Sequence, residues 1–396
     1  MQGGFKVSAS KKFSRFDNYL LKGKLRRNGF ERWRYVFTGT NKITGEQRTF
    51  FVELYYVNPA VSPDAPVLSQ KSRPKISASD LQYALAGTAS AQSVSQEMAV
   101  LPSYALVKAG VYGEGGRQFN QFFPAKNLSF VKHDDAFKLG EFTFSNSMLA
   151  GEISVSPMQL RENPELLCAS GSMDWNLHFE KNIECAPLCT TKTNLWMPIG
   201  ARTVFAGLVH LDGNEYTIVP RSSSGYIDKS WGVNIPDPFF HLSSSNLTSI
   251  ISGKPLMKSC FAVEGEFDGT LTVFINIEGK QFSINGKPRF FDKYTEIHNW
   301  SEMPSDADGE KLHWTVSVHK KRLVVDMDIF CKTLEMFVRD YEVPQGERKL
   351  LKVLGGGTGF GEIRVYKKVG KNLELLEHAN VGEAVCEYGS IEKIED

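Results

Sequence analysis

Short runs in which apolar and polar residues alternate, separated by turn residues, dominate this chain. Residues 30–37 place an aromatic side chain at every second position from Trp33 to Phe37, and residues 49–57 (TFFVELYYV) follow a turn rich in glycine, threonine and asparagine. A period of two is typical of β-strands, because successive side chains point to opposite faces of a sheet. Helical periodicity is largely restricted to residues 157–170. We therefore predict an all-β fold with few short helices.

The length of the chain allows two domains. It has 396 residues, of which 41% are hydrophobic and 23% charged, values that are ordinary for a globular protein. We expect an N-terminal domain at residues 1–200 and a C-terminal domain at 201–396. The first would carry a basic arm at residues 5–29, which either packs on the barrel mouth or meets an anionic partner. It would also carry an insertion at residues 58–102, typical of a lid over a cavity.

Charge and hydropathy restrict the partners. The formal net charge is +1, so the chain lacks the strong basic field of a nucleic-acid-binding protein. No stretch approaches 18 uninterrupted apolar residues, so we expect no transmembrane segment, although contact with a membrane surface stays open. The N-terminus lacks the apolar core of a secretion signal, which predicts a cytoplasmic protein. The sequence does not indicate an oligomeric state.

The sequence offers no motif for a cofactor or a metal. The glycine-rich run at residues 355–361 does not fit the dinucleotide-binding pattern, and we interpret it as a strand with glycines for close packing or a bend. The sequence His133-Asp134-Asp135 is more typical of a solvated turn than of a metal site. We therefore expect no metal and no organic cofactor.

The main candidate for a site is the stretch GYIDKSWG at residues 225–232. In an extended chain Tyr226 and Asp228 would share one face, whereas Lys229 and Trp231 would share the other. A carboxyl and a phenol aimed into an apolar pocket could deliver a proton, because burial favours the neutral acid. The alternative is an exposed turn in which Asp228 and Lys229 are both solvated.

A second candidate is Glu53, which lies inside the very apolar strand 49–57. A carboxylate in such a strand must be paired, exposed at an edge or functional. We expect a structural partner, such as an arginine from the preceding strand, and keep a functional role as the alternative.

Three of these stretches are similar to a known family. The sequences FERWRYVF (30–37) and GEQRTFFVEL (45–54) resemble the first strands of the tocopherol cyclase group. The stretch at 225–232 resembles a signature shared by that group and the carotenoid 1,2-hydratases, and lipocalin-like Diels–Alderases are related. The resemblance, which spans residues 25–370, implies two lipocalin-like, calycin-like antiparallel β-barrels packed side by side. Between them it implies a hydrophobic cavity for an isoprenoid-like or polyketide-like molecule.

The resemblance also implies roles for single residues. Tyr226 and Asp228 match the proposed acid site of the hydratases, and Trp196 is the candidate for the tryptophan that belongs to it. A neutral Asp228 would protonate an alkene, Tyr226 would hydrogen-bond the acid or the substrate, and Trp196 and Trp231 would shelter the carbocation. Three further residues complete the predicted substrate contacts: Lys229, Trp33 and Glu53.

Two functions therefore remain open. The first is a cofactor-independent, acid-initiated enzyme, either an isomerase that cyclises an alkene or a hydro-lyase that hydrates it. The second is a non-catalytic, lipocalin-like carrier of an apolar small molecule, because a fold does not fix a function. In the carrier, Asp228 would pair with an arginine or with Lys229 and stay ionised.

Overall fold

The structure is a computed structural model of the whole chain. It describes residues 21–70, 86–87, 100–131, 136–184, 189–190, 194–221, 223–267, 269, 271–285, 296–306, 309–320 and 322–394. Most of the predicted basic arm, most of the insertion and the sequence His133-Asp134-Asp135 lie outside these residues. Within them, strands predominate and no helix has the length and apolar character needed to cross a membrane. The all-β prediction is confirmed.

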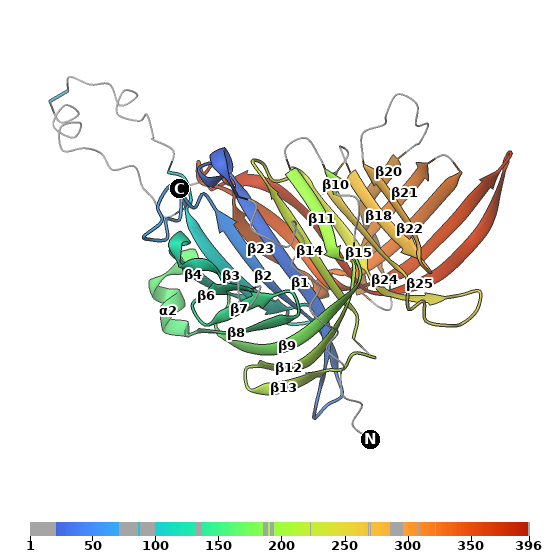
Figure 1. Cartoon of the computed structure of the whole chain (residues 1–396), viewed down its shortest axis with the longest axis horizontal. Helices are drawn as coiled ribbons and strands as arrows, with labels where there is room; N and C mark the ends of the chain where they lie inside the picture. The colour runs from blue at the N-terminus through green and yellow to red at the C-terminus, as the bar shows by residue number, and fades with distance from the viewer. Residues whose placement is uncertain are drawn as a thin grey trace.

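The first sheet contains 14 of the described strands, all paired antiparallel (Figure 1). Its main path runs β10-β11-β14-β1-β13-β12-β9-β8-β7-β6-β5, and β2, β3 and β4 extend it from the other side of β1. The strands are β1 (Phe30–Asn41), β2 (Gln47–Val57), β3 (Tyr104–Val111), β4 (Arg117–Phe123), β5 (Leu128–Val131), β6 (Ala136–Leu139), β7 (Phe142–Ser145), β8 (Met148–Val155), β9 (Gly171–Ile183), β10 (Cys189–Thr190), β11 (Asn194–Gly200), β12 (Arg202–Leu211), β13 (Asn214–Ile218) and β14 (Gly225–Gly232).

The second sheet contains the other 11 described strands, in the order β19-β18-β17-β15-β25-β24-β22-β21-β20, with β16 on β25 and β23 on β24. The strands are β15 (Phe239–Ser244), β16 (Asn246–Ser249), β17 (Cys260–Glu266), β18 (Leu271–Ile277), β19 (Lys280–Asn285), β20 (Glu296–Asp306), β21 (Gly309–Lys320), β22 (Leu323–Lys332), β23 (Phe337–Glu342), β24 (Lys349–Val369) and β25 (Asn372–Lys393). The long β24–β25 hairpin projects from one end of the molecule (Figure 1).

The change from one sheet to the next comes later than the predicted division at residue 200. Strands β12, β13 and β14 pair with β9, β1 and β11, so the first sheet ends at Gly232 and the second begins at Phe239. No shift in composition marks Gly232, because the stretch that ends there is as apolar and aromatic as the strands around it.

Short helical elements connect the strands: η1 (Gly23–Arg26), η2 (Ala125–Asn127), α2 (Pro157–Glu162), η3 (Pro164–Leu166) and η4 (Thr333–Glu335). The predicted helical stretch therefore contains α2 and η3. Ser156 caps α2 through a hydrogen bond from the Gln159 amide, and the Gln159 side chain accepts in return from the Ser156 amide. Such a reciprocal cap stabilises a helix that would otherwise be too short to persist.

The glycine-rich run lies inside β24, as predicted, and its glycines allow close packing. A Cβ atom on Gly357 would lie 2.5 Å from the ring of Tyr112, and one on Gly359 would lie 2.5 Å from the sulfur of Cys386. The register of β24 against β25 shifts across this run, which marks a bulge. The strand extends well beyond the glycine-rich run on both sides.

The two sheets meet through packed side chains where the resemblance implies a cavity. An apolar cluster joins Tyr55 of β2 and Tyr104 of β3 to Phe239, Tyr341 and Val353 of the second sheet. The rings of Tyr55 and Tyr341 meet edge to face with their centroids 5.8 Å apart. Beside this cluster lies a group of fully buried charged residues, which forms the candidate site.

Candidate functional site

Strand β14 carries the stretch that the sequence singles out, and all of its residues are buried. Tyr226 and Asp228 lie on the same face, as the alternation predicts, and the Tyr226 hydroxyl donates to Asp228 Oδ2 at 3.0 Å. Asp228 has no exposed surface. The alternative of an exposed turn with a solvated aspartate is therefore wrong.

A row of charges crosses the first sheet through Asp228. The backbone register places Asp228 of β14 beside Arg34 of β1, Arg34 beside Glu53 of β2, and Glu53 beside Lys108 of β3. All four side chains are fully buried and alternate in sign. Neighbours across strands lie close enough to interact directly, so the row forms a ladder of opposite charges.

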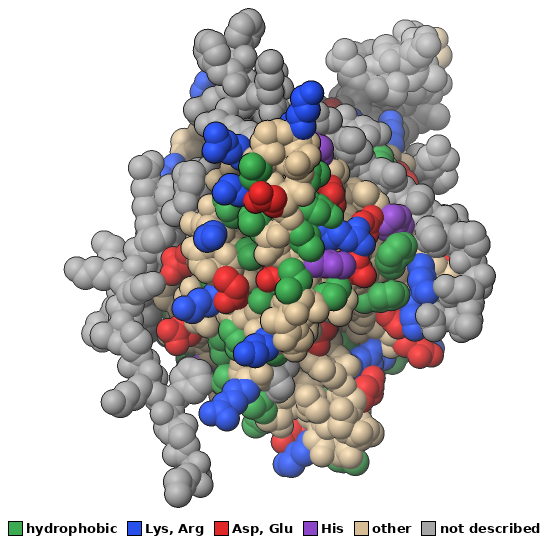
Figure 2. Space-filling view, turned by 90° about the vertical axis from the view of Figure 1, so that its right-hand side faces the viewer, with side chains coloured by type: hydrophobic (Ala, Val, Ile, Leu, Met, Phe, Trp, Pro, Cys, Tyr) green, Lys and Arg blue, Asp and Glu red, His purple; other side chains and the backbone are tan. Residues whose placement is uncertain are grey.

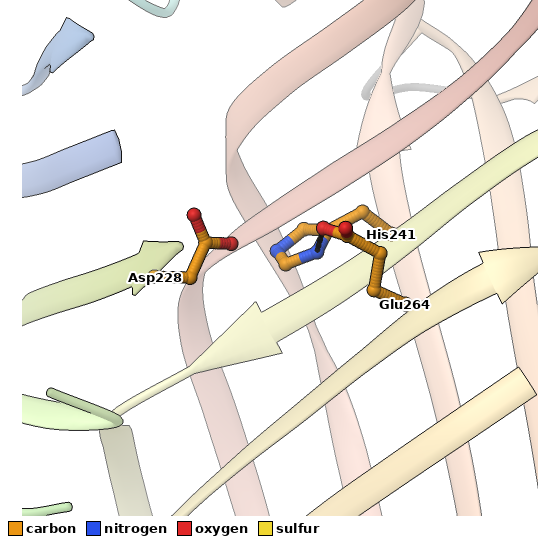
Figure 3. A group of neighbouring side chains, drawn as sticks. All are labelled: Asp228, His241 and Glu264. Atoms are coloured by element: carbon orange, nitrogen blue, oxygen red, sulfur yellow. Dashed lines mark hydrogen bonds and ion pairs between the residues drawn. The ribbon is translucent and has the colours of Figure 1, made fainter. Parts of the chain in front are cut away.

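A second row faces the first from the other sheet. Glu264 of β17 lies beside His241 of β15, and His241 lies beside Glu387 of β25. Figure 3 shows Asp228 directed toward His241 and Glu264 from the opposite sheet. The two rows meet in the interior between the sheets, where water does not screen their charges.

Arg34 joins the two rows. Its Nη2 atom lies 2.5 Å from Asp228 Oδ2, and its Nη1 atom lies 2.5 Å from Glu387 Oε2. The same Nη2 atom is 2.9 Å from His241 Nε2. One guanidinium therefore binds a carboxylate of each sheet, and its planar set of donors suits this bridging position.

Two more arginines cross between the sheets. Arg339 of β23 donates to Glu53 Oε1 at 2.9 Å and also to Glu387. Arg32 of β1 donates to Glu264 Oε2 at 3.1 Å. The predicted arginine partner of Glu53 is thus present as an ion pair, but it comes from the second sheet, while Arg34 of the preceding strand lies beside Glu53 in register.

The environment shifts the protonation of the second row in opposite directions. Burial raises the pKa of Glu264 to about 8, although the Arg32 guanidinium acts against this rise. Burial and the neighbouring Arg34 hold the pKa of His241 well below its ordinary value, so the imidazole is neutral. Burial alone would also raise the pKa of Glu387, but Arg339 and Arg34 outweigh it and hold that pKa below its usual range.

The structure brings Trp196 to the acid, as the resemblance implies. Trp196 lies on β11, and its indole Nε1 donates to Asp228 Oδ2 at 3.2 Å. Burial and the Asp228 carboxylate raise the pKa of Tyr226 well above its ordinary value, which keeps its hydroxyl a donor. The three residues of the proposed acid site therefore form one hydrogen-bonded group.

Three predicted substrate contacts lie elsewhere. Lys229 points to the opposite face of β14, where its Nζ pairs with Glu31 at 2.6 Å. It lies 4.5 Å from the ring centre of Trp33 and 5.5 Å from that of Trp231. These residues belong to the core of the first sheet, so Trp231 cannot shelter a carbocation at Asp228.

The contacts of Asp228 differ from those expected of a neutral acid. Arg34, Trp196 and Tyr226 all donate to the same oxygen, Oδ2, whereas the buried Oδ1 has no hydrogen-bond partner. A guanidinium at 2.5 Å stabilises the ionised carboxylate. This pairing with an arginine is the arrangement that the carrier alternative predicts.

Asp228, His241 and Glu264 offer the ligand types of a metal site, and their ligand atoms lie within 4.8 Å of one another. Arg34 Nη2, however, is 2.5 Å from Asp228 Oδ2 and 3.8 Å from Glu264 Oε2. The guanidinium already supplies a positive charge to this position, and a metal ion would meet its repulsion. The donor set therefore does not fit a cation while Arg34 stays in place.

Three pockets of the described chain lie away from Asp228. One, of about 530 Å³, opens at the end of the first sheet and has Tyr56, Phe130 and Phe137 in its wall, with Arg26 and Lys126 among its polar residues. The second is a groove of about 1040 Å³ beside η3, near the start of β24 and the end of β25, and the third lies beside the β24–β25 hairpin. None of these three is lined by Asp228, Tyr226 or Trp196.

Comparison with known proteins gives distant structural likenesses. No protein-family model matches the chain, and no curated protein sequence is similar to it. Kievitone hydratase from Nectria haematococca is 10% identical, with 91% of this chain and 89% of that chain covered and a TM-score of 0.42. A putative AttH from Nitrosomonas europaea is 10% identical, with 89% and 92% covered and a TM-score of 0.38.

Sequence patterns did not predict the second row, which consists of Glu264, His241 and Glu387. Glu264 lies in a run of buried residues on β17, and Glu387 lies within the buried part of β25. A charged residue inside an apolar strand is the signal that identified Glu53, and it applies equally to Glu264, which occurs in the sequence CFAVEGE. His241 and Arg34 carry no such signal, because their neighbours do not distinguish them from other polar strand residues.

The raised pKa of Glu264 predicts a pH dependence of stability. The folded chain holds this proton up to about pH 8, whereas an unfolded glutamic acid releases it at about pH 4.3. Its contribution is therefore complete below the unfolded value and is lost as pH rises through the folded value. Relative to Glu264→Gln, the wild-type free energy of unfolding should fall by up to about 1.4 kcal/mol per pH unit in this window. Urea unfolding of the wild type and of Glu264→Gln between about pH 4.3 and about pH 8 measures this difference. A wild-type free energy of unfolding that rises with pH relative to the variant would contradict the prediction.

Proposed function

We propose that this chain is a cofactor-independent enzyme that starts a reaction by protonating an alkene, as a cyclase or a hydratase. The substrate would be a hydrophobic isoprenoid-like or polyketide-like molecule. The observation that carries the proposal is the hydrogen-bonded group of Tyr226, Asp228 and Trp196. The Tyr226 hydroxyl and the Trp196 indole both donate to the buried Oδ2 atom of Asp228.

The chemistry needs an acid, a means of stabilising a carbocation and the exclusion of water. A proton added to one alkene carbon leaves a positive charge on the next carbon. The unpartnered Oδ1 of Asp228 would stabilise that charge, and the Trp196 ring would add about 0.5–2 kcal/mol by cation–π attraction. Water or an internal hydroxyl then attacks the carbocation and loses a proton, which gives a hydrated or a cyclised product. Most of the rate enhancement would come from substrate orientation and electrostatics.

The reaction can be tested with 2-prenylphenol in deuterium oxide. A cyclase returns a chroman of the same composition that carries one deuterium on carbon, and a hydratase returns the tertiary alcohol. Mass spectrometry of the recovered probe, and of ligand extracted from protein purified from its own host, measures the outcome. If every tested alkene and every native ligand is recovered unchanged, the enzyme proposal is wrong.

A carrier function is the second candidate, because two observations favour it. Asp228 is paired with Arg34, and a substrate would have to displace packed side chains to reach it. The pocket of about 530 Å³ at the end of the first sheet has a size within the usual range for small-molecule sites. In a carrier, Asp228→Asn would bind the extracted ligand as tightly as the wild type, and the ligand would leave unchanged.

We propose that the β24–β25 hairpin makes the contact with a membrane surface that an apolar substrate requires. Leu373 and Leu375 are 51% and 47% exposed, and Lys368 and Lys371 lie beside them at the tip. Figure 2 views this end of the molecule and shows hydrophobic side chains among basic and acidic ones. Exposed leucines with adjacent lysines suit an anionic lipid surface, which takes up apolar side chains and attracts positive charge.

The double substitution Leu373→Ser/Leu375→Ser should reduce binding to phosphatidylserine-containing vesicles by about tenfold, measured by co-sedimentation. Full burial of a leucine contributes about 1.5–3 kcal/mol, and a leucine whose tip alone enters the lipid contributes a fraction of this, about 0.7 kcal/mol each. The matched control is Ile43→Ser, because Ile43 is 89% exposed beside Lys42 in the β1–β2 turn and should not matter. Equal binding of the wild type to neutral and anionic vesicles would contradict the role of the lysines.

A further inference from the structure

We propose that Glu264, rather than Asp228, holds the proton that is transferred to the substrate, and that Asp228 acts as its ionised counterpart. This inference rests on the proposed function for the identity of the reaction, but the location of the proton can be measured without turnover. The two carboxyls face one another from opposite sheets, Asp228 on β14 and Glu264 on β17 (Figure 3).

Asp228 is the poorer proton donor because of its partners. Its Oδ2 atom accepts hydrogen bonds from the Arg34 guanidinium, the Trp196 indole and the Tyr226 hydroxyl. Each of these contacts is stronger when the acceptor is charged. These three donors therefore favour a role for Asp228 as a charged partner of the carbocation.

Fewer donors stabilise a negative charge on Glu264 than on Asp228. Its Oε2 atom accepts from Arg32 at 3.1 Å and lies 3.2 Å from His241 Nδ1, while Arg34 is 3.8 Å away. Its Oε1 atom is buried and has no hydrogen-bond partner. An unpartnered oxygen in the interior is destabilising as part of a carboxylate, but as a hydroxyl it is a donor that a reacting alkene can meet.

Every element packed around Glu264 contributes to this balance. Strand β1 presents Arg32 and Arg34, β14 presents Asp228, β15 presents the neutral His241, and β25 presents Glu387. Strand β18 places Thr272 beside Glu264 in register, and Thr272 carries no charge. The two other carboxylates oppose a third negative charge, and the two arginines favour it.

Where Lys108 is neutral, the count of buried charges indicates one proton. Among the described residues of the two rows and their bridges, the carboxyls are Glu53, Asp228, Glu264 and Glu387, and the guanidiniums are Arg32, Arg34 and Arg339. Lys108 is the one further cation in the rows, and it lies at the far end, where it donates to the Asp340 carbonyl oxygen. Burial lowers the pKa of Lys108 to about 7, so this counter-charge is lost as the pH rises through that value. Once Lys108 is neutral, a proton on Glu264 leaves three carboxylates balanced by three guanidiniums.

In the proposed step, Glu264 transfers its proton to the alkene and later recovers a proton. The π electrons of the alkene form a C–H bond with the proton of Glu264 as its O–H bond breaks, which leaves a carboxylate and a carbocation. The oxygen of water, or of a substrate hydroxyl, then bonds to the carbocation, and the proton it loses returns to Glu264. The cycle consumes only the alkene and, for hydration, one water.

Infrared spectroscopy of the intact chain locates the proton directly. A protonated buried carboxyl shows a C=O stretch that is separate from the carboxylate bands and that shifts in deuterium oxide. We expect this band at about pH 6, its loss as the pH rises to about pH 9, its absence in Glu264→Gln and its presence in Asp228→Asn. Labelling all glutamates, and separately all aspartates, with ¹³C at the side-chain carboxyl tests the residue type in the unmodified chain, even if a variant fails to fold.

The infrared and activity measurements test the location of the proton and the proposed function separately. A band that shifts with the aspartate label and disappears in Asp228→Asn would overturn the proposal, and so would a glutamate band that survives in Glu264→Gln. A band assigned to Glu264 in a chain that leaves every alkene unchanged would support the proton location while contradicting the proposed function. With an active substrate, Glu264→Gln should lower kcat by about 10²-fold or more.

Discussion

Replacing Arg34 with methionine is expected to lower the free energy of unfolding by about 3–5 kcal/mol, because it leaves buried carboxylates without their partner. Arg34 binds Asp228 and Glu387, one from each sheet, and all three side chains are fully buried. Burial opposes the charge on Arg34, but the two carboxylates outweigh this effect and raise its pKa. Urea unfolding followed by tryptophan fluorescence measures the loss.

Two further variants separate the charge effect from a loss of packing. Arg364 pairs with Asp328 and Glu362, but its side chain is 37% exposed, so Arg364→Met should cost less than about 1 kcal/mol. Adding Asp228→Asn to Arg34→Met should restore part of the stability, since it removes one unpaired charge. If Arg34→Met and Arg364→Met have equal effects, the two rows are not a buried ion network of the kind described.

Replacing Asp228 with asparagine is expected to lower turnover of an accepted alkene by about 10²-fold or more, which corresponds to about 2.7 kcal/mol of transition-state stabilisation. The substitution keeps the size of the side chain but removes the negative charge that would face the carbocation through Oδ1. It also weakens the hold on Arg34, Trp196 and Tyr226, so substrate orientation should suffer as well. Steady-state kinetics with 2-prenylphenol, or with the ligand extracted from the host, measures the change.

A matched aspartate shows whether the effect is specific. Asp174 accepts from His210 at 2.8 Å on the partly exposed surface of β9 and β12, so Asp174→Asn should leave turnover unchanged. Turnover by Asp228→Asn within a few-fold of the wild type would rule out a role for this carboxylate in the chemical step. Together with the infrared measurement, these kinetics distinguish an ionised Asp228 that stabilises charge from a neutral one that donates a proton.

Local periodicity determined the secondary structure well. Alternation identified the strand around Trp33. For an extended stretch at 225–232 it also placed Tyr226 with Asp228, and Lys229 with Trp231 on the other face. The prediction of Trp231 as a substrate contact contradicted this same alternation, and the structure follows the alternation. The resemblance added Trp196, which no local signal in its segment indicated.

Strand lengths and strand pairing were harder to predict from the sequence than the face of each side chain. Strands β24 and β25 are 21 and 22 residues long. Glycines and charged residues weaken the local strand signal along them, whereas pairing with neighbouring strands maintains them. The end of the first sheet at Gly232 depends on which strands pair, and β13 and β14 both join β1 along one side.

The sequence by itself determined that this protein is built from β-strands, and that a tyrosine and an aspartate share one face if their stretch is extended. Both follow from a period of two, which is a property of neighbouring residues. Only the tertiary structure decided what that aspartate faces. Arg34 is 194 positions from it, Glu264 lies on the other sheet, and the partners of Arg34 include Glu387, 353 positions away. Face alternation says which way a side chain points, but the packing of one sheet on another sets its partner and its charge.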